Sequence, residues 1–120
     1  MSQHSSLSPE RWQSFTAAQQ ILMIANEMNR AAKLMRPEDD SRRLNSYARV
    51  LQLADLTVDA PHRSAFRGEL LRWRDLVAKL YFERVANPVE HDRAMDALLL
   101  FTGESAKQRG HVARAVDAAR

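Results

Sequence analysis

The stretch FRGELLRWRDLVAKLYFERV, residues 66–85, carries two sets of apolar residues at helical spacing. Residues three and four apart share one face of an α-helix, because each residue turns the helix by about 100°. The main set consists of Phe66, Leu70, Trp73, Leu76, Val77, Leu80 and Tyr81. The second set, on another face, consists of Leu71, Ala78, Phe82 and Val85. Since a surface helix needs only one apolar face, the stretch predicts a helix that is contacted from two sides.

The chain before this stretch predicts two more helices. The first begins at Pro9, with Ser8 as its cap, and continues to about Met35, where Pro37 approaches. It also carries apolar residues on two sides, with Trp12 opposite its main stripe. The next helix starts at the acidic residues 38–40 and has a single apolar face. These patterns predict one long, two-faced helix followed by an ordinary amphipathic one.

The remaining boundaries follow from prolines and caps. We expect the helix that contains residues 66–85 to start near Asp59, with Pro61 in its first turn, and to place Gly68 at a close contact between helices. Asn87 and Pro88 then predict the start of a last helix. Its inward residues should be His91, Ala94, Met95, Leu98 and Phe101, before Thr102 and Gly103 end it.

The predicted fold is all-α, an antiparallel four-helix bundle with long first and third helices and a weakly ordered C-terminal segment. We expect one domain over residues 1–120, which is an ordinary domain length. Residues 1–7 are expected to be a flexible lead, and residues 104–120 a frayed helix or a tail.

The composition narrows the classes of function. The chain has no cysteine, which removes disulfides, thiolate nucleophiles and cysteine-ligated metal sites. The formal net charge is only +3, too small to indicate nucleic-acid binding by itself. The longest apolar runs fall far short of the roughly 20 residues that a membrane helix needs. We therefore expect a cytoplasmic protein with no membrane contact and no cofactor, and the scattered histidines predict no metal site.

Arg84 and His91 form the one candidate catalytic pair. Both should lie at the same end of the bundle, where a cation could stabilise a phosphate and an imidazole could move a proton. His91 follows Arg84 after six residues, and this spacing resembles the Arg-x(4–6)-His motif of the HEPN superfamily. The resemblance implies a small helical bundle and, as in many of its members, a metal-independent ribonuclease with one site across a dimer. That family usually has a polar residue after the arginine, where this chain has Val85. The alternative is that Arg84 covers helix-end carbonyls while His91 is a partly buried side chain.

Two polar surfaces have both a functional and a structural interpretation. Arg63, Arg67 and Arg74 share one side of their helix and could meet phosphates, or form a solvated face. The first helix carries Asn26, Glu27, Asn29, Arg30 and Lys33 after its most apolar segment. These groups could line a ligand pocket or an interface, or could simply face water where the helix leaves the core.

The leading functional hypothesis is a non-catalytic interaction or assembly module. Full burial of Leu71 or Phe82 would contribute roughly 1.5–3 kcal/mol each, so the second stripe predicts a homodimer contact or a surface for a protein partner. A competing explanation is that residues 104–120 fold back over the stripe. RNA binding or cleavage through Arg84 and His91 is the alternative function.

Overall fold

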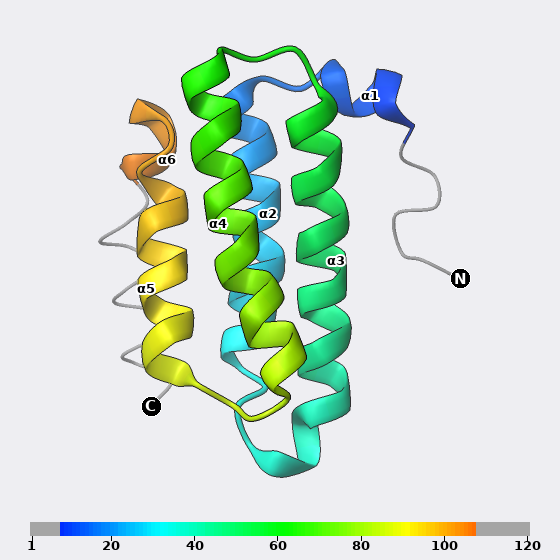
Figure 1. Ribbon diagram of the computed structural model, residues 1–120, viewed down its shortest axis with the longest axis vertical. Coiled ribbons are helices and arrows are strands. Elements are labelled where there is room, and N and C mark those ends of the chain that lie inside the picture. The colour runs from blue at the N-terminus through cyan, green and yellow to red at the C-terminus, as the bar shows by residue number, and fades with distance from the viewer. Residues whose placement is uncertain (1–7, 108–120) are drawn as a thin grey trace.

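The computed structural model describes residues 8–107, apart from the side chain of Glu104. This part of the chain is mostly helical and contains no β-strand. Figure 1 shows the longer helices lying side by side along the long axis of the molecule. Their bounds are α2 Ala17–Ala32, α3 Asp40–Asp59, α4 Ser64–Glu83 and α5 Pro88–Leu99, and the shorter elements are α1 Pro9–Gln13, η1 Pro37–Asp39 and α6 Gly103–Ala106.

The prediction of one continuous first helix is wrong, because residues 14–16 are not helical and separate α1 from α2. Thr16 begins α2 with a capping box: its hydroxyl accepts from the Gln19 amide at 3.1 Å, and its own amide donates to Gln19 Oε1 at 2.8 Å. Ser14 Oγ donates to the Arg11 carbonyl at 2.6 Å and closes α1. The break lets α1 turn across one end of the molecule (Figure 1).

The break also places Trp12 in the core, where it is fully buried. Its indole N–H donates to Thr57 Oγ1 at 2.9 Å, and the Thr57 hydroxyl donates to the Leu53 carbonyl at 2.8 Å. The backbone carbonyl of Trp12 accepts from Gln20 Nε2 at 2.9 Å. Since Gln20 Oε1 can only accept, His62 Nε2, 2.9 Å away, must be the donor to it. These contacts fasten α1 to α2, α3 and the loop before α4.

Other boundaries agree in part with the prediction. The start of α5 is confirmed, with Asn87 Oδ1 accepting from the Glu90 amide at 3.2 Å. The start of α4 is wrong by a few residues: α3 continues through Asp59, and α4 begins only at Ser64. Gly103 opens the short helix α6, in which Ser105 is buried and its hydroxyl donates to the Leu99 carbonyl at 2.8 Å. The predicted frayed helix or tail covers 104–120, of which residues 104–106 belong to α6. Its part from 108 to 120, like the predicted flexible lead 1–7, lies outside the described residues.

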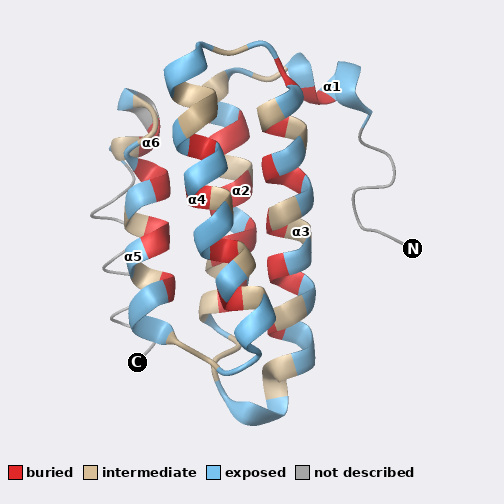
Figure 2. Cartoon of the chain, in the orientation of Figure 1, coloured by how far each residue is buried: buried red, intermediate tan, exposed pale blue. Residues whose placement is uncertain are grey.

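The core lies between the long helices, whose buried sides face inward in Figure 2. It contains Trp12, Ile21, Ile24, Met28, Ala31, Tyr47, Val50, Leu53, Leu70, Trp73, Val77, Leu80, Ala94, Met95, Leu98 and Leu99, with smaller side chains between them. The prediction is wrong for Leu76, whose side chain is 51% exposed. It is also wrong for Gly68, because a Cβ built there would meet nothing closer than the tip of Arg72 at 4.0 Å.

Candidate functional site

Arg43, in the first turns of α3, is a fully buried cation that joins three segments of the chain. Its Nη1 donates to the Leu34 carbonyl at 3.1 Å and to Asp40 Oδ1 at 2.7 Å. Its Nη2 donates to the Arg84 carbonyl at 3.0 Å. Leu34 and Arg84 follow the last turns of α2 and α4, where carbonyl groups lack helical partners. The single guanidinium therefore caps two helix ends and holds them against the start of α3.

His91 and Tyr47 form a buried pair beside Arg43. The Tyr47 hydroxyl lies 2.7 Å from His91 Nδ1, and both side chains are almost completely buried. Burial raises the pKa of Tyr47 to about 12, and Asp92 adds to this increase while Arg43 opposes it. The phenol is thus protonated at neutral pH and can donate to Nδ1.

Burial lowers the pKa of His91 to about 4, and the Arg43 guanidinium acts in the same direction. Asp92 and the backbone of Met28 oppose the decrease. His91 Nε2 is buried and has no partner with hydrogen-bond geometry among the described residues. The imidazole is therefore neutral at pH 7 and fixed inside the protein.

Arg84 takes the left-handed conformation that ends α4, with φ of 63°, and its side chain is exposed. Arg43 connects its backbone to the end of the molecule that holds His91, so the two predicted residues do share one end. They differ in access to solvent, since His91 is only 1% exposed. RNA cleavage by this pair would need an opening that uncovers His91, and it stays a prediction.

The structure separates the three predicted nucleic-acid contacts. Arg63 is exposed at the start of α4. Arg67 is half-buried and donates from Nη2 to the Ala60 carbonyl at 3.1 Å. Arg74 forms an ion pair with Asp55 of α3, with Nε 2.5 Å from Oδ1. Two of the three cations thus hold the chain together around α4, and one faces water.

The residues of the second apolar stripe are exposed, apart from the half-buried Ala78. The prediction that one helix carries all of them is wrong for Val85, because α4 ends at Glu83 and Val85 follows its left-handed cap. Leu71 is 45% exposed, Phe82 73% and Val85 74%. Residues 103–107, the described start of the C-terminal segment, turn instead toward α2, which α6 contacts. Within the described chain, nothing buries these three side chains.

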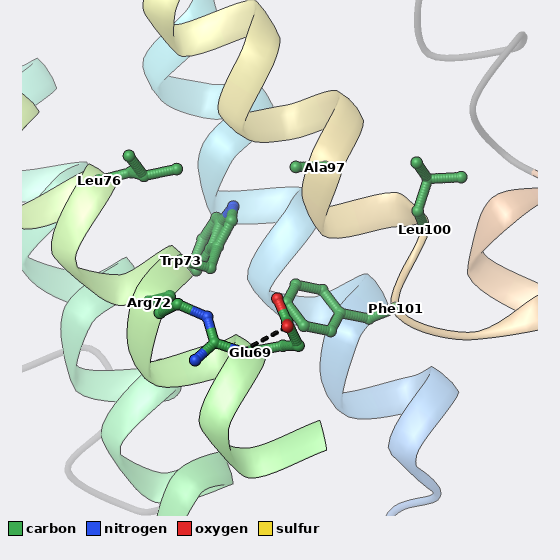
Figure 3. A pocket seen from close by; sticks show the side chains of 7 residues that line it. All are labelled: Glu69, Arg72, Trp73, Leu76, Ala97, Leu100 and Phe101. Carbon is green, nitrogen blue, oxygen red and sulfur yellow. Dashed lines mark hydrogen bonds and ion pairs between the residues drawn. The ribbon is translucent and has the colours of Figure 1, made fainter. Parts of the chain in front are cut away.

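A groove between α4 and α5 is not predicted by the sequence pattern. It has a volume of about 390 Å³, and Figure 3 shows its lining residues Glu69, Arg72, Trp73, Leu76, Ala97, Leu100 and Phe101. The Trp73 indole lies between the two helices and donates to the Ala94 carbonyl at 2.8 Å. Leu76, one turn farther along α4, also lines this groove, and its side chain is 51% exposed. The helical periodicity places Leu76 in the main apolar set and could not predict this exposure.

No comparison with known proteins identifies a relative: no family model matches the chain, and neither the curated proteins nor the solved structures yield a match. In the part of the chain that the structure describes, no helix is long and apolar enough to cross a membrane. The same residues contain no group of three histidine or acidic side chains placed to hold a metal ion. The function of this chain is therefore inferred from the surfaces of the molecule alone.

Proposed function

We propose that this chain is a small non-catalytic assembly module, an antiparallel bundle of α2, α3, α4 and α5 that forms a homodimer through the outer face of α4. The observation that carries the proposal is the exposure of Leu71 and Phe82 on α4, and of Val85 just beyond its end, outside the hydrophobic core. Burying a side chain of this size contributes roughly 1.5–3 kcal/mol. Dimerisation would bury these side chains and gain this free energy, because folding of the described residues leaves them exposed to water.

The order of residues along α4 suits contact with a second copy of the same helix. A two-fold axis near the middle of α4 would bring Leu71 against Phe82 of the partner subunit, with the small Ala78 close to the crossing point. The same arrangement would place Asp75 opposite the partner's Lys79, so that unlike charges meet. An apolar stripe with complementary charges beside it is typical of a self-complementary helix contact.

The experiment is sedimentation over a range of protein concentrations. We expect the wild-type chain to dimerise, and the double variant Leu71→Asp/Phe82→Asp to be monomeric. The matched control is Val89→Asp/Leu100→Asp, which also adds two negative charges at exposed apolar positions, on or beside α5. It should still dimerise, and circular dichroism should show that both variants are folded.

Other results would redirect the proposal. A wild-type chain that is monomeric at all concentrations would overturn self-association and leave a different protein as the partner of this surface. Equal weakening by both double variants would place the contact elsewhere. A cytoplasmic location is part of the same proposal, and fractionation of cells that produce the chain would test it.

A further inference from the structure

A second surface, separate from the outer face of α4, gathers positive charge in one concavity. A groove of about 430 Å³ lies between the C-terminal half of α2 and the N-terminal half of α3. Its lining residues are Arg30, Lys33, Leu34, Arg42, Asn45, Ser46 and Arg49. Both walls contribute two cations, and only Leu34 is a large apolar residue. Ligand pockets of this volume are usually mostly apolar, so the composition of this groove indicates a polar, negatively charged ligand.

Glu27 contacts two of the cations that line the groove, Arg30 and Arg49. Its carboxylate is almost completely buried, with Oε1 3.2 Å from Arg30 Nη1 and Oε2 3.6 Å from Arg49 Nη1. Because Arg30 comes from α2 and Arg49 from α3, the carboxylate holds guanidinium groups on both walls. A guanidinium has five N–H donors, so each arginine keeps donors for another acceptor while it contacts Glu27.

Two further cations that line the groove, Arg42 and Lys33, make no contact with Glu27. Arg42 Nη1 lies 3.5 Å from Asp39 Oδ1. Lys33 makes no ion pair with any residue in the described range 8–107. The four cations thus lie on the two walls of one groove, and no carboxylate is among the residues that line it.

We propose that this groove binds a small molecule that carries two or more adjacent phosphate groups. Arginine side chains donate two parallel hydrogen bonds to phosphate oxygens, and lysine adds a mobile point charge. Arginines fixed by Glu27 lose less side-chain freedom on binding than free ones would. The Asn45 amide and the Ser46 hydroxyl, which also line the groove, are further neutral donors.

The shape of the surface favours a compact polyanion over a nucleic-acid strand. Proteins that bind a single nucleic-acid strand usually spread their cations along the path of its backbone and add aromatic side chains on which bases stack. Here the cations converge on one groove with no aromatic side chain in its lining. On α4, where the sequence predicted nucleic-acid contacts, Arg67 is hydrogen-bonded to the Ala60 carbonyl and Arg74 is paired with Asp55.

The test is isothermal titration of the full chain with inorganic tripolyphosphate at low salt. We expect saturable binding with one site per chain, weakened by added salt because charge attraction dominates. The double variant Lys33→Glu/Arg42→Glu should bind roughly tenfold more weakly or worse, since both exposed side chains face the groove. The matched control Arg11→Glu/Arg93→Glu makes the same change in net charge at exposed positions outside both the groove and the α4 stripe, and it should bind as wild type does.

Further titrations separate the possible sources of the phosphate groups. Equal affinity for ATP and tripolyphosphate would support recognition of the phosphate chain alone, and tighter binding of ATP would support a nucleoside polyphosphate as the ligand. No binding of tripolyphosphate at millimolar concentration, or equal weakening by both double variants, would overturn the proposal. Tighter binding of single-stranded RNA that grows with its length would overturn it in favour of a nucleic acid. Because the groove and the α4 stripe are tested by different variants, either proposal can fail without the other.

Discussion

The two ends of this molecule secure their helices with different chemistry. At the α1 end, Trp12, Gln20 and Thr57 exchange neutral hydrogen bonds. At the opposite end, where α4 turns into α5, the buried charge of Arg43 binds two helix-end carbonyls. The α1 end has an extra helix to cover it, and can therefore use a large apolar side chain. The Arg43 end has only turns and the short helix η1, and the helix-end carbonyl groups there favour a cation.

The largest effect is expected at the α1 end, from Trp12→Ala. Removing this fully buried side chain should lower the free energy of unfolding by about 4 kcal/mol, because it leaves a cavity under α1. The control Trp12→Phe keeps most of the ring but loses the hydrogen bond to Thr57, and should cost about 1 kcal/mol. Urea denaturation measures both. Equal losses would mean that the hydrogen bond, and not burial, fastens α1.

At the other end, Arg43→Met should cost about 3 kcal/mol, because it leaves the Leu34 and Arg84 carbonyls without their donor. Arg43→Lys keeps the charge but cannot reach both carbonyls with one planar group, so it should recover only part of the loss. The same denaturation experiment gives the comparison. A neutral or stabilising Arg43→Met would show that desolvation of the guanidinium cancels its contacts, as happens for some buried ion pairs.

The sequence predicted the helices better than the way their ends are held. Periodicity and local caps were sufficient for α5, since Asn87 bonds to a residue only three positions away. The break before α2 also left a local signal, the capping pair Thr16 and Gln19, although the apolar pattern continues through it. What decides the break is the contact of Trp12 with Thr57, 45 residues later. Contacts at such separations are invisible to periodicity.

The same limit applies to the candidate sites. His91 was correctly placed on the inward face of its helix, but its partner Tyr47 lies 44 residues earlier. The role of Arg43 could not be predicted, because it binds the backbone carbonyl of Arg84 and every residue type has such a carbonyl. The exposure of Phe82 was predictable, since a second stripe on one helix exceeds what a single core face needs.

A smaller effect is expected in how the free energy of unfolding depends on pH, and it should differ between the Arg43 end and the α1 end. The pKa of His91 is about 4 in the folded chain and near 6.5 when unfolded, so the unfolded state binds more protons between these values. The contribution of the neutral imidazole is therefore fully present above pH 6.5 and decreases as the pH falls toward 4. Between pH 7 and pH 5 the loss should be about 2 kcal/mol.

Denaturation midpoints of wild type and His91→Gln across this range isolate the effect, because glutamine does not titrate. His62 at the α1 end has a pKa lowered in the same direction, by burial and by Arg67, but its side chain is partly exposed. His62→Gln should therefore remove less of the pH dependence than His91→Gln. The reverse order would mean that the α1 end, and not the Arg43 end, is the acid-sensitive one.

The smallest effect, from Gly68→Ala, gives a baseline for both ends. Gly68 lies inside α4 without a positive φ, and the nearest atom to an added Cβ is Arg72 Nη2 at 4.0 Å. Alanine should therefore raise the free energy of unfolding by about 0.5–1 kcal/mol, by restricting the unfolded chain and favouring helix. Because neither network includes this position, the pH dependence of stability should keep its wild-type slope. A destabilised variant would show that another molecule or an undescribed segment packs against Gly68, and would restore the close contact that the sequence predicted.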